Sequence, residues 1–319
     1  MNSKSSVTLA LCMDFSSTSS DLKPLSNAEF HTLLEAIKLY NGAESEQLNL
    51  FQSDDSFNFA FLTEIDLRFL EDKLGIKSEL SNRIMALLKR SAAISFEIER
   101  LKSIAKVVTV FDDGYPQKLK CRLGKLPKSM REPALLYFCG DLGIQKINFV
   151  GFVGARNIDD SDKDWTESAI KRIYGKAKNE KDVIGIVSGG AEGIDQISEY
   201  AALQLSMPVI EFSKNMKISL DSLEVIDAVQ DQNMLLFSEV NPLRRLSKYE
   251  AMAHFTNRNK YIYAMSEYAV VVKSAKGSKS GTWKGATEAL EKNICKVYVR
   301  NAKYEGNVDL ITRGGVPIS

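Results

Sequence analysis

Histidine, cysteine and long apolar runs are scarce in this chain of 319 residues. The two histidines, His31 and His254, are too few and too far apart for a metal site or a catalytic triad. The four cysteines have no CxxC spacing, so the sequence supports neither a zinc site nor a disulfide framework, and a reducing cytoplasm fits. No apolar run reaches the roughly 18–20 residues of a membrane span, so we expect no membrane association.

An excess of one charge is also missing, because 42 Lys and Arg face 41 Asp and Glu. This balance excludes a uniformly basic nucleic-acid coat. It nevertheless hides a split, since residues 241–303 contain 13 Lys and Arg against 4 Asp and Glu, whereas residues 1–240 are net acidic. Such an asymmetry indicates a phosphate or polyanion ligand on one part of the fold.

The first 105 residues read as a small helical domain without recognisable chemistry. Ser26 and Glu29 have the spacing of a capping box, and the apolar positions that follow have helical periodicity as far as Asn41-Gly42, where we expect the helix to end. A second long helix is predicted over residues 79–105.

From residue 106 onward, short apolar strands alternate with helical patterns. This alternation predicts an α/β domain over residues 106–319, with a doubly wound, mostly parallel sheet beside the helical domain of residues 1–105. The predicted strands are 107–111, 148–153, 183–187, 209–212, 234–237, 269–273 and 296–299.

Glycine-rich turns follow two of these strands, and ligands of parallel sheets bind outside the carboxyl ends of strands. After the strand at 148–153, Gly154 permits a close turn and Arg156 offers a planar donor fork for a phosphate; the alternative is a plain turn with a solvated arginine. After the strand at 183–187, the run 188–195 places three glycines before a helix. Its exposed amides and the helix dipole suit an anion, although a tight turn without a ligand has the same pattern.

Residues of that second turn with candidate roles are Ser188, Gly189, Gly190 and Gly193. Asp195 fits a backbone-organising acceptor better than a catalytic acid.

A third candidate site lies in the basic segment, where cations, hydroxyls and a helix start converge after the strand at 269–273. Such cations supply salt-sensitive affinity for phosphates, and the alternative is a solvated lysine-rich loop. Tyr261, Tyr263 and Trp283 are able to stack on bases, but such residues are more often packing residues. The candidate phosphate contacts here are Arg258, Asn259, Lys260, Lys273, Lys279, Ser280, Gly281, Thr282 and Lys284.

Seven ordered motifs carry a family resemblance. They are Asp113-Gly114-Tyr115-Pro116, Phe152–Arg156, Ser188–Asp195, Ser238-Glu239, Arg258-Asn259, Ser280-Gly281 and Leu310-Ile311 with Gly314-Gly315. On these motifs the chain resembles the DprA/Smf DNA-processing family over nearly its whole length.

The resemblance implies a Rossmann-like domain that binds and protects single-stranded DNA and helps to load a RecA-type recombinase in transformation or recombination. It also implies a cytoplasmic homodimer and no catalytic residues, metal or cofactor, so we do not expect an enzyme.

The chain departs from the family pattern at several positions. Glu192 stands where the family usually has Arg, Glu199 stands where it has His, and Thr282-Trp283 replaces a common Ser-Leu. The chain ends at Ser319, so we expect no C-terminal winged helix.

Two other functions remain open at this point. The same fold can hold a discrete nucleotide, as in a sensing module that acts in defence against foreign DNA. A nucleoside-monophosphate phosphoribohydrolase is disfavoured, because Gly285 occupies the position where that family has its glutamate.

Overall fold

The computed structural model describes two compact units. The described residues are 3–16, 22–45 and 65–319. The first unit comprises Met1–Tyr115, Gly124–Tyr137 and Asn241–Arg245, and the second comprises Pro116–Leu123, Phe138–Val240 and Leu246–Ser319. Each unit is therefore assembled from separate stretches of chain, and the domain boundary between residues 105 and 106 stays a prediction.

In the first unit, the described residues up to Leu101 form only helices. These are α1 (Ser3–Cys12), α2 (Asn27–Ser45), η3 (Phe69–Lys73), α3 (Ser78–Leu88) and α4 (Ser91–Leu101). They are followed by β1 (Lys106–Thr109), η4 (Lys128–Met130) and the beginning of β2 (Leu135–Cys139).

The capping box at the start of α2 is confirmed, but the predicted end of this helix is wrong. The Ser26 amide donates to the Glu29 carboxylate at 2.8 Å, and the Glu29 amide donates to the Ser26 hydroxyl at 3.4 Å. The helix continues through Asn41-Gly42 to Ser45. A glycine inside a helix costs only about 1 kcal/mol, which the apolar face beginning at Phe30 outweighs.

The single long helix predicted over residues 79–105 is also wrong, because the chain breaks it at Arg90 into α3 and α4. The Arg90 guanidinium donates to the carbonyl oxygens of Ala10 at 2.7 Å and of Met13 at 2.5 Å. The periodicity of apolar residues within the helix cannot reveal this contact, because its partners are about 80 positions away in the sequence.

The second unit contains a parallel sheet, as predicted for an α/β fold. Its strands are β3 (Asn148–Val153), β4 (Ile184–Ser188), β5 (Val209–Phe212), β6 (Met234–Ser238), β7 (Tyr268–Val271), β8 (Lys296–Arg300) and β9 (Val316–Ile318). They are ordered β6-β5-β4-β3-β7-β8-β9, and each neighbouring pair is parallel. Every residue of β5 and β6 is buried, which is typical of parallel strands covered on both faces.

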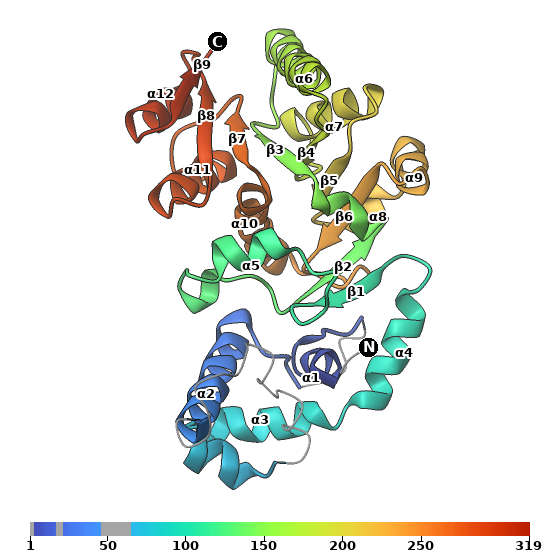
Figure 1. Cartoon of the computed structure of the whole chain (residues 1–319), viewed down its shortest axis with the longest axis vertical. Helices are drawn as coiled ribbons and strands as arrows, with labels where there is room; N and C mark the ends of the chain where they lie inside the picture. The colour runs from blue at the N-terminus through green and yellow to red at the C-terminus, as the bar shows by residue number, and fades with distance from the viewer. Residues whose placement is uncertain (1–2, 17–21, 46–64) are drawn as a thin grey trace. The chain divides into compact units, whose positions relative to one another are not determined.

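Helices cover both faces of this sheet. They are α5 (Gln117–Leu123), η5 (Leu142–Lys146), α6 (Asp160–Glu180), α7 (Ile194–Gln204), α8 (Met216–Ser219), α9 (Leu223–Gln230), α10 (Lys248–Met265), α11 (Gly281–Glu291) and α12 (Glu305–Thr312). In Figure 1, α6 and α7 lie on one side of β3, and α10 and α11 lie on the other. Among the described residues, no helix is both long and apolar enough to span a membrane.

The strand order reverses direction beside β3. From β3 the chain moves outward through β4 and β5 to β6, and α10 then returns it to β7 on the other side of β3. Such a reversal leaves a crevice outside the carboxyl ends of the two central strands, where ligands of open parallel sheets bind. This position lies beyond Val153 and Val271, the last residues of β3 and β7.

Candidate functional site

Three turns meet at the carboxyl edge of the sheet, beside the strand reversal. The Ala155 amide donates to the Lys273 carbonyl at 2.9 Å, which joins the ends of β3 and β7. The Ala155 carbonyl accepts from the Ile194 amide at 3.3 Å, and the Gly154 carbonyl accepts from the Thr282 hydroxyl at 2.9 Å. The turn after β3 is thus bonded to the first residues of both α7 and α11, and the three sequence motifs form one connected edge.

Two amides of the glycine turn, those of Gly190 and Ala191, donate to carboxyl groups of this same chain. The Asp195 carboxylate accepts hydrogen bonds from the amides of Ala191 and Gly154, and Glu199 Oε1 accepts from the Gly190 amide at 3.0 Å. Both acids are buried, with 7% and 5% of their surfaces exposed. The interpretation of Asp195 as a backbone organiser agrees with this geometry, and the Gly190 and Ala191 amides, which were expected to donate to a phosphate, already donate to carboxyl groups of the protein.

A third buried acid, Glu211, lies close enough to Asp195 and Glu199 to affect their pKa values. The Ser219 hydroxyl donates to it at 2.6 Å. Burial raises the pKa of Asp195 to about 6, and burial together with the neighbouring Glu211 and Asp195 holds the pKa of Glu199 well above its usual range. Burial also raises the pKa of Glu211. The environment therefore favours proton uptake by these three carboxyls, which we call the acid cluster.

Arg258 is the cation that faces the acid cluster. Its guanidinium donates to the Gly189 carbonyl and, at 3.2 Å, to the Phe212 carbonyl, and only 5% of the residue is exposed. Burial lowers its pKa, and the charges of Asp195 and Glu211 oppose that shift. A contact between Arg258 and DNA stays a prediction, but the geometry gives this side chain a structural role in tying the ends of β4 and β5 together.

Several other predicted phosphate contacts have partners inside the fold. The Ser188 hydroxyl donates to the Phe152 carbonyl at 2.8 Å, and the Asn259 amide group donates to the Gly281 carbonyl at 3.1 Å. Lys260 is 5% exposed, with its ammonium 5.3 Å from the ring centre of Tyr261. These three side chains therefore stabilise the carboxyl edge of the sheet through contacts within the fold.

Lys273 is held by a buried carboxylate at the start of α6. Asp162 is fully buried and accepts from Lys273 at 2.7 Å, from Arg300 at 2.6 Å and from the Tyr304 hydroxyl at 2.7 Å. Burial raises the pKa of Asp162, but these hydrogen bonds outweigh burial and hold the pKa below its ordinary value. The Lys273 ammonium therefore acts first as a tie between β7 and α6.

Exposed cations remain at the rim of the edge. Arg156 follows β3, Lys279 precedes α11, and Lys284 lies in the first turn of α11. Ser280 caps this helix by accepting from the Trp283 amide at 3.2 Å. These three side chains are the predicted contacts that are positioned to meet a ligand in solvent, because like the glycines of the turn they lie at the carboxyl ends of strands.

Two exposed cations at the same edge escaped the sequence reasoning. Lys214 follows β5, and Lys217 lies on α8. The rule that identified the other turns, a polar residue directly after a buried strand, applies equally to the segment after Phe212.

The aromatic residues proposed for base stacking are used in packing. Tyr261 and Tyr263 are 2% and 1% exposed. The Trp283 indole N–H donates to Asp309 at 2.9 Å, and the guanidinium of Arg313 lies 5.1 Å from the Trp283 ring centre. The two tyrosines are therefore buried in the fold, and the indole N–H of the half-buried Trp283 is held by Asp309.

Replacing Gly190 by alanine is expected to destabilise the protein by about 2–4 kcal/mol for two reasons. The added Cβ collides with the Glu211 carboxylate, and the backbone at Gly190 has a left-handed φ of 62°, which is unfavourable for alanine. Gly75→Ala is the matched control, since Gly75 has φ of 64° and open space around the added Cβ. Thermal unfolding of both variants checks this expectation, and equal losses would mean that only the backbone angle matters.

Comparisons with known proteins agree with this architecture. The chain is similar to the X-ray structure of DNA processing protein A from Streptococcus pneumoniae, with 21% identity and a TM-score of 0.60, over 92% of this chain and 95% of that chain. It is also similar to DNA processing protein A from Helicobacter pylori, with 23% identity and a TM-score of 0.51, over 66% of this chain and 90% of that one. At these identities the structures support the fold.

The structure from Helicobacter pylori is described as giving insight into a single-stranded DNA binding mode of that protein. No curated protein sequence matches the chain. The family model of DNA recombination-mediator protein A matches residues 106–318, which span the whole parallel sheet and the three joined turns. The chain therefore belongs to the DNA recombination-mediator protein A family.

Proposed function

We propose that this protein binds single-stranded DNA along the carboxyl edge of the second unit's sheet, as a DNA-processing protein. The observation that carries the proposal is the separation of charge at this edge: the acid cluster is buried, while Arg156, Lys279 and Lys284 are exposed. A backbone of phosphates meets the exposed cations and is shielded from the acids. The description of the Helicobacter pylori relative supports the choice of a single strand.

We propose a binding function rather than an enzymatic one. Asp195, Glu199 and Glu211 are each less than 8% exposed, and the first two hold backbone amides. General acid or base catalysis needs a carboxyl within hydrogen-bond reach of the substrate. These side chains are buried and hold the glycine turn in place, which favours a structural role for them.

A mononucleotide ligand is a weaker candidate for the same edge. A cradle for a single phosphate uses the amides of a glycine-rich turn, and here the Gly190 and Ala191 amides donate to Glu199 and Asp195. Thermal-shift measurements separate the two ligands, because stabilisation by an oligonucleotide and not by mononucleotides supports the DNA proposal.

The proposal includes a RecA-type recombinase as protein partner and a homodimer as the working form. The family description as a recombination mediator supports the recombinase. The homodimer follows from the resemblance of the motifs to the DprA/Smf family. Both extend the DNA-binding role, because a mediator must hold the strand on which the recombinase assembles.

Replacing Arg156, Lys279 and Lys284 together by alanine is expected to weaken oligo(dT) binding by about tenfold or more and to reduce the slope of log affinity against log salt, because each phosphate contact adds to counterion release. Fluorescence anisotropy at several salt concentrations measures both quantities. Lys292→Ala is the control, since Lys292 is exposed at the opposite end of α11. An unchanged affinity and slope in the triple variant would place the DNA elsewhere.

A further inference from the structure

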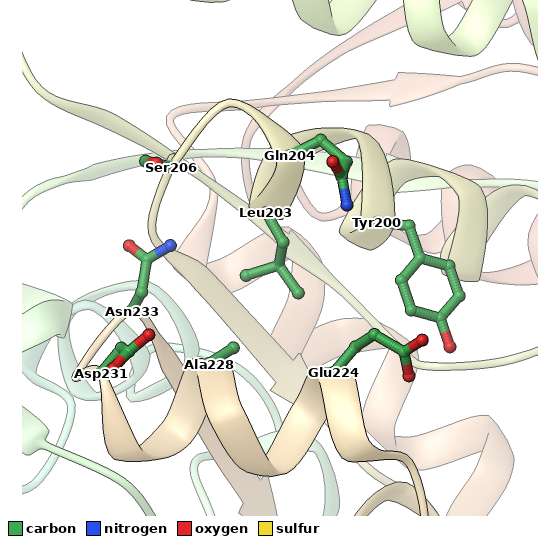
Figure 2. Close-up of a pocket in the computed structure, with 8 residues that line it drawn as sticks. All are labelled: Tyr200, Leu203, Gln204, Ser206, Glu224, Ala228, Asp231 and Asn233. Atoms are coloured by element: carbon green, nitrogen blue, oxygen red, sulfur yellow. The ribbon is translucent and has the colours of Figure 1, made fainter.

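A second surface of the same unit has a different character. A groove with a volume of about 440 Å³ lies between α7 and α9, as Figure 2 shows. Its volume is within the range of sites that hold a small ligand or a few side chains. The residues that line it are Tyr200, Leu203, Gln204, Ser206, Glu224, Ala228, Asp231 and Asn233.

Apolar side chains form the middle and one end of this groove. In Figure 2, Leu203 points from α7 into the space above α9, where Ala228 lies. Tyr200 stands at one end of the groove and is 40% exposed. Leu223, which precedes the lining residue Glu224 in the chain, is 73% exposed.

All the charge in the groove lining is negative. Glu224 and Asp231 lie near opposite ends of the groove, and the eight lining residues include neither lysine nor arginine. Asp227 adds a third carboxylate on α9, which has no basic residue. The Ser222 hydroxyl donates to Glu224 at 2.7 Å and lowers the pKa of that exposed carboxyl, so the charge persists in weak acid.

This combination disfavours a nucleic acid and favours a partner with basic side chains. Phosphates are repelled by two carboxylates, whereas Lys or Arg side chains are attracted to them. Leu203 and Ala228 favour an apolar side chain between these cations, because a polar one placed against them loses its water without gaining a partner. A peptide segment can present an apolar side chain between two basic ones, and the aliphatic stems of the basic side chains can lie on the apolar residues of the groove.

We propose that the groove between α7 and α9 binds a segment of a partner protein that inserts one apolar side chain beside Leu203 and pairs flanking Lys or Arg residues with Glu224 and Asp231. This site is separate from the edge assigned to DNA, whose cations follow β3 and flank the start of α11. The protein is thereby able to hold a DNA strand and a basic partner segment at once.

The test uses short synthetic peptides and the full chain. One peptide has a central leucine flanked by lysines, a second has glutamates in place of the lysines, and a third has serine in place of the leucine. Anisotropy titrations are expected to show saturable binding of the first peptide only. In the double variant Glu224→Lys with Asp231→Lys, this affinity is expected to fall by about tenfold or more, because attraction becomes repulsion.

Asp227→Lys is the matched control, with the same charge change on the same helix but outside the groove lining. It is expected to change peptide affinity by less than about threefold, and neither variant is expected to weaken oligo(dT) binding. Equal losses in both variants, or equal binding of the leucine and serine peptides, would reduce the effect to general charge attraction and overturn the proposal. Self-association of the wild type that the double variant abolishes would also overturn it, because the occupant would then be a second copy of this chain.

Discussion

Replacing Asp162 by alanine is expected to lower the free energy of unfolding by about 3 kcal/mol or more, because it removes the carboxylate that Arg300 and Lys273 share and leaves Lys273, among the described residues, with only the Asp159 carboxylate at 3.8 Å. Asp162 is fully buried, while Lys273 and Arg300 have 21% and 12% of their side-chain surface exposed. Their partial exposure lets water compensate in part, so the loss is placed at the lower end of the range for broken buried pairs. The change also removes the capping box that starts α6.

Urea-induced unfolding measures this loss, with Asp160→Ala as the control because Asp160 is exposed in the first turn of the same helix. The pH dependence has a definite sign. Since the pKa of Asp162 is lowered in the fold, its contribution is present above an unfolded value of about 4 and is lost as the pH falls through the folded pKa. Wild type and Asp162→Ala should therefore converge in acid. A constant difference down to the acid limit would contradict the ion-pair explanation.

Replacing Arg258 by methionine is the second change with a large expected effect. Methionine fills much of the volume but leaves the acid cluster without its cation, which is expected to cost about 3–5 kcal/mol at pH 7.5. The loss should shrink as the pH falls. The three carboxyls already have raised pKa values, and without Arg258 those values rise further. The folded state then holds more protons than the unfolded state above about pH 4, so acid favours folding.

Thermal unfolding between pH 5 and 7.5 measures this recovery. Lys279→Met is the control, because Lys279 is exposed before α11 and its replacement is expected to leave stability nearly unchanged at every pH. A loss for Arg258→Met that is independent of pH would mean that packing, and not the charge facing the carboxyls, accounts for the role of Arg258. Because Arg258→Met is destabilised at pH 7.5, its DNA binding is to be measured at a temperature where the variant is still folded.

The order of strands and helices in the second unit was predictable because its signals are local. Buried strands such as β5 stand out as short apolar runs, and the turns after them contain the glycines and polar residues that strand ends require. Two strands escaped prediction for different reasons. β2 is a short apolar run, but it lies in a passage whose prolines indicate irregular structure, and β9 has only three residues.

The roles of individual site residues were less predictable, because they depend on partners that are distant in the sequence. Nothing near Lys273 in the chain reveals that Asp162, 111 positions away, holds its ammonium. Arg258 looks the same in sequence as an exposed phosphate ligand, and only the fold places three acids beside it. Composition located the basic segment, whereas burial decided which of its cations face solvent.

The bonds from the Gly190 and Ala191 amides to Glu199 and Asp195 form when the protein folds and do not depend on a bound ligand. The amides of a phosphate-binding turn lack partners until the ligand binds, whereas the Gly190 and Ala191 amides here already donate to Glu199 and Asp195. These bonds are consequently formed before any ligand binds, and an exposed rim residue such as Lys279 can be exchanged without touching them. Affinity for a polyanion can thus be raised or lowered one surface cation at a time across evolution, while the framework beneath stays constant.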